Sequence, residues 1–460
     1  MHELLKRDLM ALPELLTQAR ETALISLLGL GAQPAAVCPR PPQAQLLRSA
    51  EPGAAAALRL FERHWLPRLA ASAGPRYLGF VTGGATPASL VGDWLTAALD
   101  QNPTAGWDSD APELERQTVR ELADWFGLGA AHEGAFVSGA TMSNFVGLAL
   151  AREWLGEQQG LHVSEAGVAA LGPVTLLSGA PHSSIHKALA MLGLGRQALQ
   201  LVATQAGRDA VDVAALERAL LAQQGRPVIV VANAGTVNSG DFDDLQAIAA
   251  LRQRYPFWLH VDAAFGAFAT LDPRVAAQVG GLDAADSVCV DCHKWMNVPY
   301  DSALQFTRHR ELQLRVFQNA AAYLGDPGER PDFVHLTPEN SRRWRALAAW
   351  FAVQAYGREG HAEIVSRNID GARRLGELVE QDLTLTLLAP VRLNIVCFAV
   401  QGLEDRASVQ ALLERLRDTG EAFLTPTLFQ GRWAVRAAFS NWRTSLDDVD
   451  RVFAALKKVS

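Results

Sequence analysis

The segment at residues 258–307 constrains the fold of this chain more than any other part of the sequence. It contains two short apolar runs, Trp258–Val261 and Val288–Val290. Uninterrupted apolar runs of this length are typical of strands that are buried on both faces of a parallel sheet. The first run is followed directly by Asp262, and the second leads to Lys294. Because ligands of open α/β sheets bind at the carboxyl ends of the strands, the pattern predicts that both side chains face one crevice.

Lysine is rare in this chain, which narrows the choice of a reactive amine. The five lysines are Lys6, Lys187, Lys294, Lys457 and Lys458. Three of them lie at the chain ends, where order is poor. Lys187 falls in a predicted amphipathic helix, whereas Lys294 follows a buried strand, where a lysine is unusual unless it has a function. A reactive amine is therefore expected at Lys294 or at Lys187.

A lysine and an aspartate at one crevice suit an aldehyde cofactor that carries a basic ring nitrogen. The amine forms a Schiff base with the aldehyde, and the carboxylate keeps the ring nitrogen protonated so that the ring withdraws electrons. A phosphate site is predicted at Ser138-Gly-Ala-Thr141, where an apolar run meets a glycine-led helix start with unpaired backbone N–H groups. Ser138 or Thr141 could add a hydroxyl. Together these features indicate pyridoxal 5'-phosphate (PLP).

Two motifs resemble the group II PLP-dependent decarboxylases, the family of aromatic-L-amino-acid and glutamate decarboxylases. They are His-Val-Asp-Ala-Ala at residues 260–264 and Asp-Cys-His-Lys-Trp at residues 291–295. The resemblance spans roughly residues 77–456. It implies PLP fold type I, the aspartate aminotransferase-like α/β architecture, and an amino acid decarboxylase that acts through a Lys294 Schiff base.

The resemblance also implies roles for individual residues. Asp262 would pair with the ring nitrogen, and His182 would stack on the ring and assist proton transfer together with Lys294. The other implied cofactor contacts are Ala140, Thr141, Thr236, Ala264 and His293. On the substrate side, the resemblance implies Thr82 and Gly83, which lie in a glycine-rich loop.

One departure from the family pattern concerns the proton donor. These decarboxylases usually carry a tyrosine on a mobile loop, but residues 325–343 contain none. Phe333 lies near the corresponding position, the nearest tyrosines are Tyr300 and Tyr323, and His335 is another candidate. Decarboxylation of an amino acid is the expected reaction. The alternatives are aldehyde-forming oxidative decarboxylation, a carbon–carbon lyase, an aminotransferase, and a non-catalytic PLP-binding homologue.

Strand and helix patterns alternate between residues 174 and 307, which predicts a doubly wound, mostly parallel sheet. Beyond Arg308 the pattern predicts a smaller α+β domain. The expected parts are an N-terminal helical arm (1–75), a large PLP-binding domain (76–325), and a linker helix with a small C-terminal domain (326–460). In the family that the chain resembles, the arm wraps around a second subunit, so a homodimer is expected.

Composition and cysteine spacing argue against other classes of protein. The formal net charge is −7 and no basic stripe is visible, so no nucleic-acid partner is expected. No apolar run is long enough to span a membrane, and a cytoplasmic location is the default expectation. The four cysteines are too few for a disulfide framework, and Cys289 and Cys292 lack the second pair that a zinc site needs.

The spacing of polar residues and glycines also suggests two other kinds of site. A metal site could use the histidines and aspartates at 260, 262, 291 and 293, but it would leave Lys294 and the predicted phosphate site unexplained. The Gly-Leu-Gly runs at residues 29–31 and 127–129 lack the third glycine and the preceding strand of a dinucleotide fingerprint. We therefore expect no metal and no dinucleotide.

Overall fold

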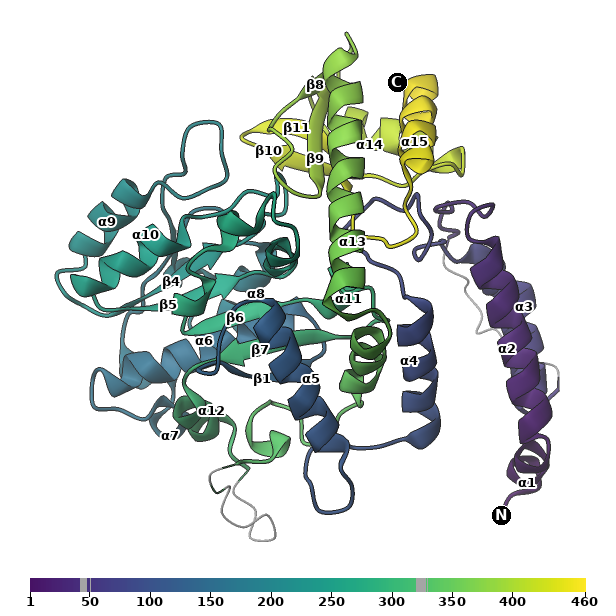
Figure 1. The fold of residues 1–460 in the computed structure, drawn as a ribbon, viewed down its shortest axis with the longest axis horizontal. Coiled ribbons are helices and arrows are strands. Elements are labelled where there is room, and N and C mark those ends of the chain that lie inside the picture. The colour runs from purple at the N-terminus through teal and green to yellow at the C-terminus, as the bar shows by residue number, and fades with distance from the viewer. Residues whose placement is uncertain (42–47, 50, 320–327, 329) are drawn as a thin grey trace.

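The computed structural model describes residues 1–41, 48–49, 51–319, 328 and 330–460. Within these residues the chain forms a large lobe around a seven-stranded sheet and a smaller lobe around a four-stranded sheet (Figure 1). The long helix α13 (Arg345–Gln381) runs from one lobe into the other (Figure 1). The predicted α/β class is confirmed.

The large sheet is mostly parallel, as predicted. Its strand order is β1-β7-β6-β5-β4-β2-β3, and all pairs from β6 to β3 are parallel. β7 pairs antiparallel with both β6 and β1. The strands are β1 (Glu133–Val137), β2 (Leu176–Ser178), β3 (Leu199–Leu201), β4 (Val228–Asn233), β5 (Phe257–Asp262), β6 (Ser287–Val290) and β7 (Ala303–Thr307). The apolar runs form β4, β5 and β6, whose residues are all buried because helices cover both faces.

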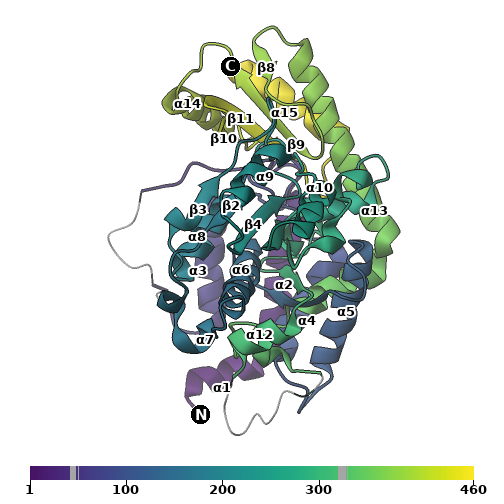
Figure 2. The same ribbon diagram turned by 90° about the vertical axis from the view of Figure 1, so that its left-hand side faces the viewer.

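Helices cover the two faces of this sheet in two groups. One core joins the sheet to α5 (Ala111–Trp125), α9 (Val213–Leu221), α10 (Leu245–Ala250) and α13. The other joins it to α6 (Ala140–Glu157), α8 (Ser183–Met191) and α12 (Arg310–Phe317). Figure 2 shows β2 and β4 between α8 and α10. The large lobe also contains α4 (Pro87–Leu99), α7 (Val163–Ala166) and α11 (Cys292–Trp295).

The small lobe is a four-stranded antiparallel sheet in the order β10-β11-β9-β8. Its elements are β8 (Leu385–Leu387), β9 (Ile395–Val400), α14 (Arg406–Asp418), β10 (Thr425–Phe429), β11 (Arg432–Ala438) and α15 (Leu446–Val459). α15 begins with a capping box between Ser445 and Asp448, and two lysines lie in its last turn, which suits the helix dipole. Leu78 also packs in the core of this lobe.

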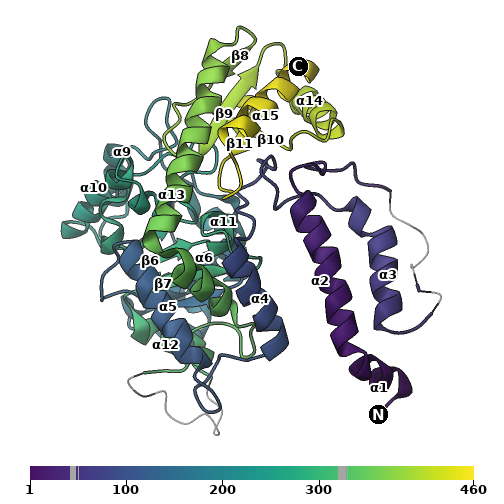
Figure 3. The same ribbon diagram turned by 45° about the vertical axis from the view of Figure 1, so that its right-hand side comes forward.

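The N-terminal arm consists of α1 (Glu3–Met10), α2 (Leu12–Gly29) and α3 (Ala54–His64). Figure 3 shows α2 and α3 as a pair that stands apart from the rest of the molecule. Neither α1 nor α2 contains a buried residue. Several large apolar side chains of the arm are exposed, among them Leu16, Ile25 and Leu28.

Some details differ from the sequence-based expectations. The predicted strand that ends at Val290 is followed by the short helix α11, which begins at Cys292. α13 has a break at Gly357, whose φ of 58° is outside the helical region. The domain boundary expected between residues 325 and 326 lies outside the described residues, and the boundary at residue 75 stays a prediction. In the part of the chain that the structure describes, no helix is both long and apolar enough to cross a membrane.

Candidate active site

A cavity of about 570 Å³ lies where the carboxyl ends of β4, β5 and β6 meet the small lobe. This volume is in the range of small-molecule and cofactor sites. The residues from the predicted cofactor set that line it are Ala140, His182, Thr236, Asp262, Ala264, His293 and Lys294. The crevice predicted from the strand ends is therefore present, and it brings most of the predicted residues together.

Lys294 lies in α11, directly after β6, and its amine is paired with a buried carboxylate. Lys294 Nζ lies 3.3 Å from Asp291 Oδ2, and His293 Nε2 lies 3.0 Å from Asp291 Oδ1. Burial disfavours the charged ammonium, but Asp291 and Asp262 together raise the pKa of Lys294 above its usual value. The pKa of Asp291 is lowered because Lys294 and His293 outweigh the effect of burial. The other candidate, Lys187, is exposed on α8.

Asp262 is the last residue of β5, and its carboxylate is held from two sides. Asn144 Nδ2 donates to Asp262 Oδ2 at 3.0 Å, and the backbone N–H of Ala264 donates to Asp262 Oδ1 at 3.2 Å. These two contacts hold the carboxylate in one position. Asp262 is 6% exposed and remains open to the cavity.

His182 caps the N-terminus of α8 and lines the cavity opposite the strand ends. Its Nδ1 accepts from the hydroxyl of Ser184 at 2.8 Å and from the backbone N–H of Ser184 at 3.2 Å. Burial lowers the pKa of His182, although Asp262 nearby acts in the opposite direction. His182 is therefore a neutral imidazole with its proton on Nε2 near neutral pH.

The N-terminus of α6 provides the predicted anion site. Ala140 is its first residue and lines the cavity, while Gly139 is the N-cap. The first N–H groups of a helix have no intrahelical acceptor and lie at the positive end of its dipole. Thr141 follows in the same turn but is not among the residues that line the cavity.

Thr236 is held in the β4–α10 loop by a polar cluster that includes Asp209, Ser239 and Asp241. Thr236 Oγ1 lies 3.2 Å from Asp209 Oδ2, and Ser239 Oγ donates to the same oxygen at 2.7 Å. Burial raises the pKa of Asp209. The Thr236 hydroxyl also accepts from the backbone N–H of Asp241 at 3.0 Å. These contacts fix the loop that carries Thr236, Val237 and Asn238 into the cavity wall.

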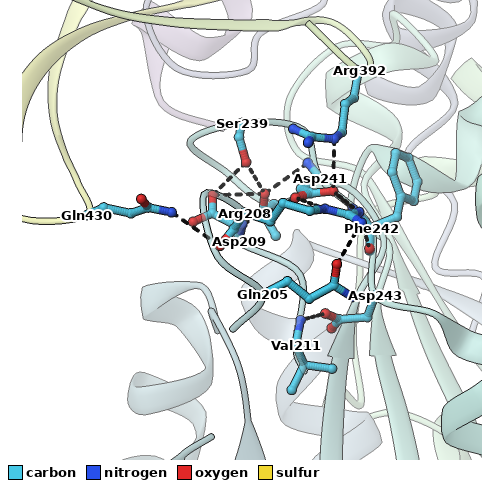
Figure 4. A network of polar contacts seen from close by, with 11 residues as sticks. Gln205, Arg208, Asp209, Val211, Ser239, Asp241, Phe242, Asp243, Arg392 and Gln430 are labelled. Carbon is cyan, nitrogen blue, oxygen red and sulfur yellow. Dashed lines mark hydrogen bonds and ion pairs between the residues drawn. The ribbon is translucent and has the colours of Figure 1, made fainter. Parts of the chain in front are cut away.

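The same cluster ties this loop to both lobes (Figure 4). Arg208 forms a bidentate pair with Asp241 at 2.7 and 3.1 Å, and Arg392 Nε from the small lobe lies 3.4 Å from Asp241 Oδ1. Asp243 is fully enclosed and accepts from the backbone N–H groups of Val211 and Asn233 at 2.6 and 2.7 Å. Burial raises the pKa of Asp243 to about 6.

Arg436 on β11 brings a cation from the small lobe into the cavity wall. It is 8% exposed and donates to Val237 O and Thr425 Oγ1, both at 3.3 Å. Burial lowers its pKa, and its Nε is buried with no hydrogen-bond partner among the described residues. The ion pairs found in the described residues include none for Arg436, so its charge is available to an anion in the cavity.

Thr82 and Gly83 lie beside the cavity and are not among the residues that line it. The Thr82 hydroxyl is 3.4 Å from the Tyr300 hydroxyl. Gly83 packs against the backbone of Lys294 so closely that a Cβ at this position would collide with the Lys294 carbonyl oxygen. The absence of a side chain at Gly83 thus allows its backbone to pack directly on the segment that carries Lys294.

The residues considered as proton donors in place of the loop tyrosine differ in whether they line the cavity. Tyr300 lines the cavity, and its ring lies on His293 with ring centroids 4.3 Å apart. His335 is 2% exposed, does not line the cavity, and accepts from the backbone N–H of Asn319 at 3.2 Å. Phe333 is buried as well. The proposal of His335 as a substitute is therefore wrong, and Tyr323 lies outside the described residues.

The rival metal site is not formed. Both ring nitrogens of His260 are in hydrogen bonds, with Ser287 at 2.8 Å and Asn144 at 2.9 Å, so neither is free to ligate a metal. Among the residues that the structure describes, no group of three or more potential ligands could hold a metal ion.

Two residues of the site, Asn144 and Arg436, were missed by reasoning from the sequence. Asn144 follows the predicted phosphate turn by one helical turn, so its polarity on a buried helix face was an available signal. Arg436 lies in β11, a central strand of the small sheet that also begins with an arginine, Arg432, so its signal in the sequence was weaker.

The chain has clear relatives among known proteins. The family model described as the pyridoxal-dependent decarboxylase conserved domain matches residues 61–401. The chain is 30% identical over 384 residues to L-2,4-diaminobutyrate decarboxylase from Rhizobium meliloti, with 81% of this chain and 75% of that relative covered. It is 26% identical over 401 residues to aromatic-L-amino-acid decarboxylase from Bacillus atrophaeus, with 84% of this chain and 81% of that relative covered.

Among solved structures, the crystal structure of Oryza sativa TDC with PLP and tryptamine superimposes with a TM-score of 0.89. The match covers 98% of this chain and 97% of the other, at 23% identity. At this identity the likeness establishes the fold.

Proposed function

Because the chain belongs to the pyridoxal-dependent decarboxylase family, we propose that it is an amino acid decarboxylase that binds PLP through Lys294. The observation that carries this assignment is the convergence of Lys294, Asp262, His182 and the N-terminus of α6 on one cavity. The substrate is a small-molecule amino acid.

The groups around the cavity fit PLP in their chemistry. Lys294 supplies an amine for the aldehyde, Asp262 supplies a carboxylate for the ring nitrogen, and the first turn of α6 supplies N–H groups for the phosphate. His182 provides a flat face for the ring, and Thr236, Ala264 and His293 complete the proposed contacts. Bound there, PLP supplies an electron-withdrawing ring that stabilises negative charge on the substrate α-carbon when carbon dioxide leaves.

The protein groups then have separate tasks. Asp262, held in place by two N–H donors, would keep a proton on the ring nitrogen that it faces. Asp291 pairs with the Lys294 amine and holds it at the cavity wall. Lys294 Nζ can later return a proton to the substrate α-carbon. Tyr300, with its hydroxyl at the cavity wall, is the second proton donor in this proposal.

Arg436 is the proposed site for a carboxylate of the substrate. It is a buried cation in the cavity wall, and guanidinium groups bind carboxylates through directed N–H donors. Phe80 and Phe265 provide apolar surface in the same cavity. An amino acid can thus present its carboxylate to Arg436 and its side chain to an apolar wall.

We further propose a cytoplasmic homodimer. The support for a second subunit is the arm, whose helices expose apolar side chains that water does not favour. The support for the compartment is that all four cysteines are unpaired, and three of them are buried.

The experiment that tests the function uses purified protein loaded with PLP and a pool of amino acids in air. We expect the wild type to release carbon dioxide and to convert one amino acid into its amine, as measured by mass spectrometry. Borohydride reduction followed by peptide mapping should find the cofactor mass on Lys294. Lys294→Ala should lose both the product and the cofactor adduct.

Lys187→Ala is the matched control, because it removes the other lysine within the body of the chain and should change neither readout. An adduct on Lys187, or turnover that survives in Lys294→Ala, would contradict the assignment. An aldehyde product in place of the amine would leave the assignment of the site unchanged, but it would show that the reaction is an oxidative decarboxylation.

A further inference from the structure

A chain of buried polar groups extends from Asp262 into the core, away from the cavity. It runs through Asn144 on α6, His260 on β5, Ser287 on β6 and Trp258 on β5. All four of these side chains are within 1% of complete burial. Burying polar side chains lowers the stability of a protein unless each of them is fully hydrogen-bonded. A buried row of hydrogen bonds of this length is therefore expected to have a function.

The direction of every hydrogen bond in this chain is determined. Asn144 donates from Nδ2 to the carboxylate of Asp262, so its Oδ1 faces His260 Nε2 at 2.9 Å and accepts from it. His260 Nδ1 must then be an acceptor, and it takes the hydroxyl proton of Ser287 at 2.8 Å. Ser287 Oγ in turn accepts from Trp258 Nε1 at 3.0 Å. Each nitrogen or oxygen atom thus has a fixed assignment as donor or acceptor in these hydrogen bonds, and no other assignment satisfies all of them.

His260 is a neutral link in this chain at physiological pH. Complete burial lowers its pKa to about 4. Gly147 on α6 is part of the fit, since a Cβ there would lie 2.7 Å from the imidazole ring. A fixed, neutral imidazole holds the amide of Asn144 in one orientation, because a flipped amide would set its N–H groups against the Nε2 proton.

Asn144 also reaches the other side of the cavity. Its Nδ2 donates to Ser184 Oγ at 3.0 Å, and the Ser184 hydroxyl donates to His182 Nδ1 at 2.8 Å. One amide group therefore holds both the carboxylate of Asp262 and, through Ser184, the imidazole of His182.

Other ionisable groups also face Asp262 and contribute to its environment. Lys294 comes from α11, Cys289 from β6 and His182 from the start of α8. Asp291, which precedes α11, and Arg436 on β11 act in turn on His182. Asn144 is the neutral donor that contacts the Asp262 carboxylate from the core side.

We propose that Asn144, oriented by His260, Ser287 and Trp258, is a positioning residue that aims the ionised carboxylate of Asp262 at the ring nitrogen of PLP. This inference rests on the proposed function, because the buried hydrogen bonds can have this role only if Asp262 pairs with that nitrogen. Without these buried hydrogen bonds, the Asp262 carboxylate would be free to rotate in the cavity, and the pKa of the ring nitrogen would be lower.

The test measures the cofactor directly. The visible absorption of the bound cofactor is titrated against pH for the wild type and for Asn144→Leu, and the affinity for PLP is measured by fluorescence quenching. We expect the spectral transition of Asn144→Leu to move to lower pH by about one unit, and its affinity to fall roughly tenfold, the effect of losing one hydrogen bond to a charged group.

Ser287→Ala is the second variant, because it releases His260 without touching Asp262. Its spectral transition should move in the same direction by a smaller amount. Val288→Ala is the matched control on the same strand, since successive strand residues face opposite sides and Val288 packs in the apolar core. It should lower the melting temperature and leave the spectral transition unchanged.

The outcomes separate this inference from the proposed function. Asp262→Asn must shift the spectral transition if the function is assigned correctly, and an unchanged transition in that variant would overturn the function itself. Suppose that Asp262→Asn shifts the spectral transition, but folded Asn144→Leu and Ser287→Ala both keep the wild-type pH dependence and affinity for PLP. The buried hydrogen bonds then have only a structural role, and our inference is wrong. If Asn144→Leu does not fold, Ser287→Ala alone decides.

Discussion

At the scale of residues, the charged side chains around the cavity differ in the partners that they contact. Lys294 lies against Asp291, and Asp262 is held by neutral donors. Arg436 is a cation of the cavity wall whose hydrogen-bond partners are neutral, a backbone carbonyl and a hydroxyl. Such an arrangement costs stability unless an anion completes it, which is why we assign the substrate carboxylate to this side chain.

Arg436→Met should weaken substrate binding more than it slows the chemical step. The variant keeps most of the apolar stem but removes the guanidinium, so we expect KM to rise about 10- to 100-fold, as the loss of a charge-assisted hydrogen bond predicts. Steady-state kinetics on the identified substrate gives this value. Arg432→Met changes an exposed arginine of the same strand and should leave KM unchanged. An unchanged KM in Arg436→Met would show that the carboxylate binds elsewhere.

At the scale of elements, the strand ends and the arm differ in how they are held. β4, β5 and β6 are buried along their whole length, so the residues that follow them are placed rigidly. α1 and α2 bury no residue, although helices of this length are marginal in water without tertiary packing. The arm therefore needs a second apolar surface, which a twofold-related copy of the chain would supply.

Ile25→Glu on α2 should weaken the proposed dimer. Ile25 is 73% exposed, and a charge there would enter the interface twice, once from each subunit. Burial of one such side chain is worth roughly 1.5–3 kcal/mol, so two copies should shift the dimer dissociation constant by a factor of about 100 or more. Sedimentation velocity at micromolar concentration measures this. Gln18→Glu adds the same charge to the same helix and should remain dimeric, and a monomeric wild type would refute the dimer.

At the scale of the whole molecule, buried histidines make the free energy of unfolding depend on pH. Burial lowers the pKa of His132, His182, His260 and His361, so the unfolded chain binds more protons than the native one between about pH 4 and 6.5. These groups add stability above pH 6.5, and this contribution is lost as the pH falls toward 4. Asp243 has the opposite effect, since its pKa is raised to about 6 and its contribution falls as the pH rises through 4 to 6.

His260→Gln should therefore flatten the dependence of stability on pH. The pKa of His260 of about 4 implies that the wild type loses roughly 2 kcal/mol through this group between pH 7 and pH 5. Urea unfolding at the two pH values should show this difference reduced by a similar amount in the variant, whatever its stability at pH 7. His162→Gln replaces a histidine whose side chain is 53% exposed and should keep the wild-type difference. An equal difference in His260→Gln and the wild type would argue against a neutral His260.

The sequence by itself determined the fold class, the strand ends and most of the cavity. Apolar runs, a glycine-led helix start and a rare lysine after a buried strand are local patterns, and each predicts its own surroundings. They were enough to bring Lys294, Asp262 and the helix start at Ala140 to one crevice, and the family resemblance added His182 to them. They were also enough to predict a mostly parallel sheet, because strand burial and helix spacing are written in short windows of sequence.

Only the tertiary structure decided which distant side chains join that crevice. Arg436 enters it from a different lobe, and Asn144 reaches Asp262 from the core because α6 packs on β5 and β6. The tertiary structure also excluded His335, which is buried elsewhere, and placed Tyr300 in the wall. These contacts depend on how elements far apart in the chain pack together, and side-chain packing across such distances leaves no periodic signal in the sequence.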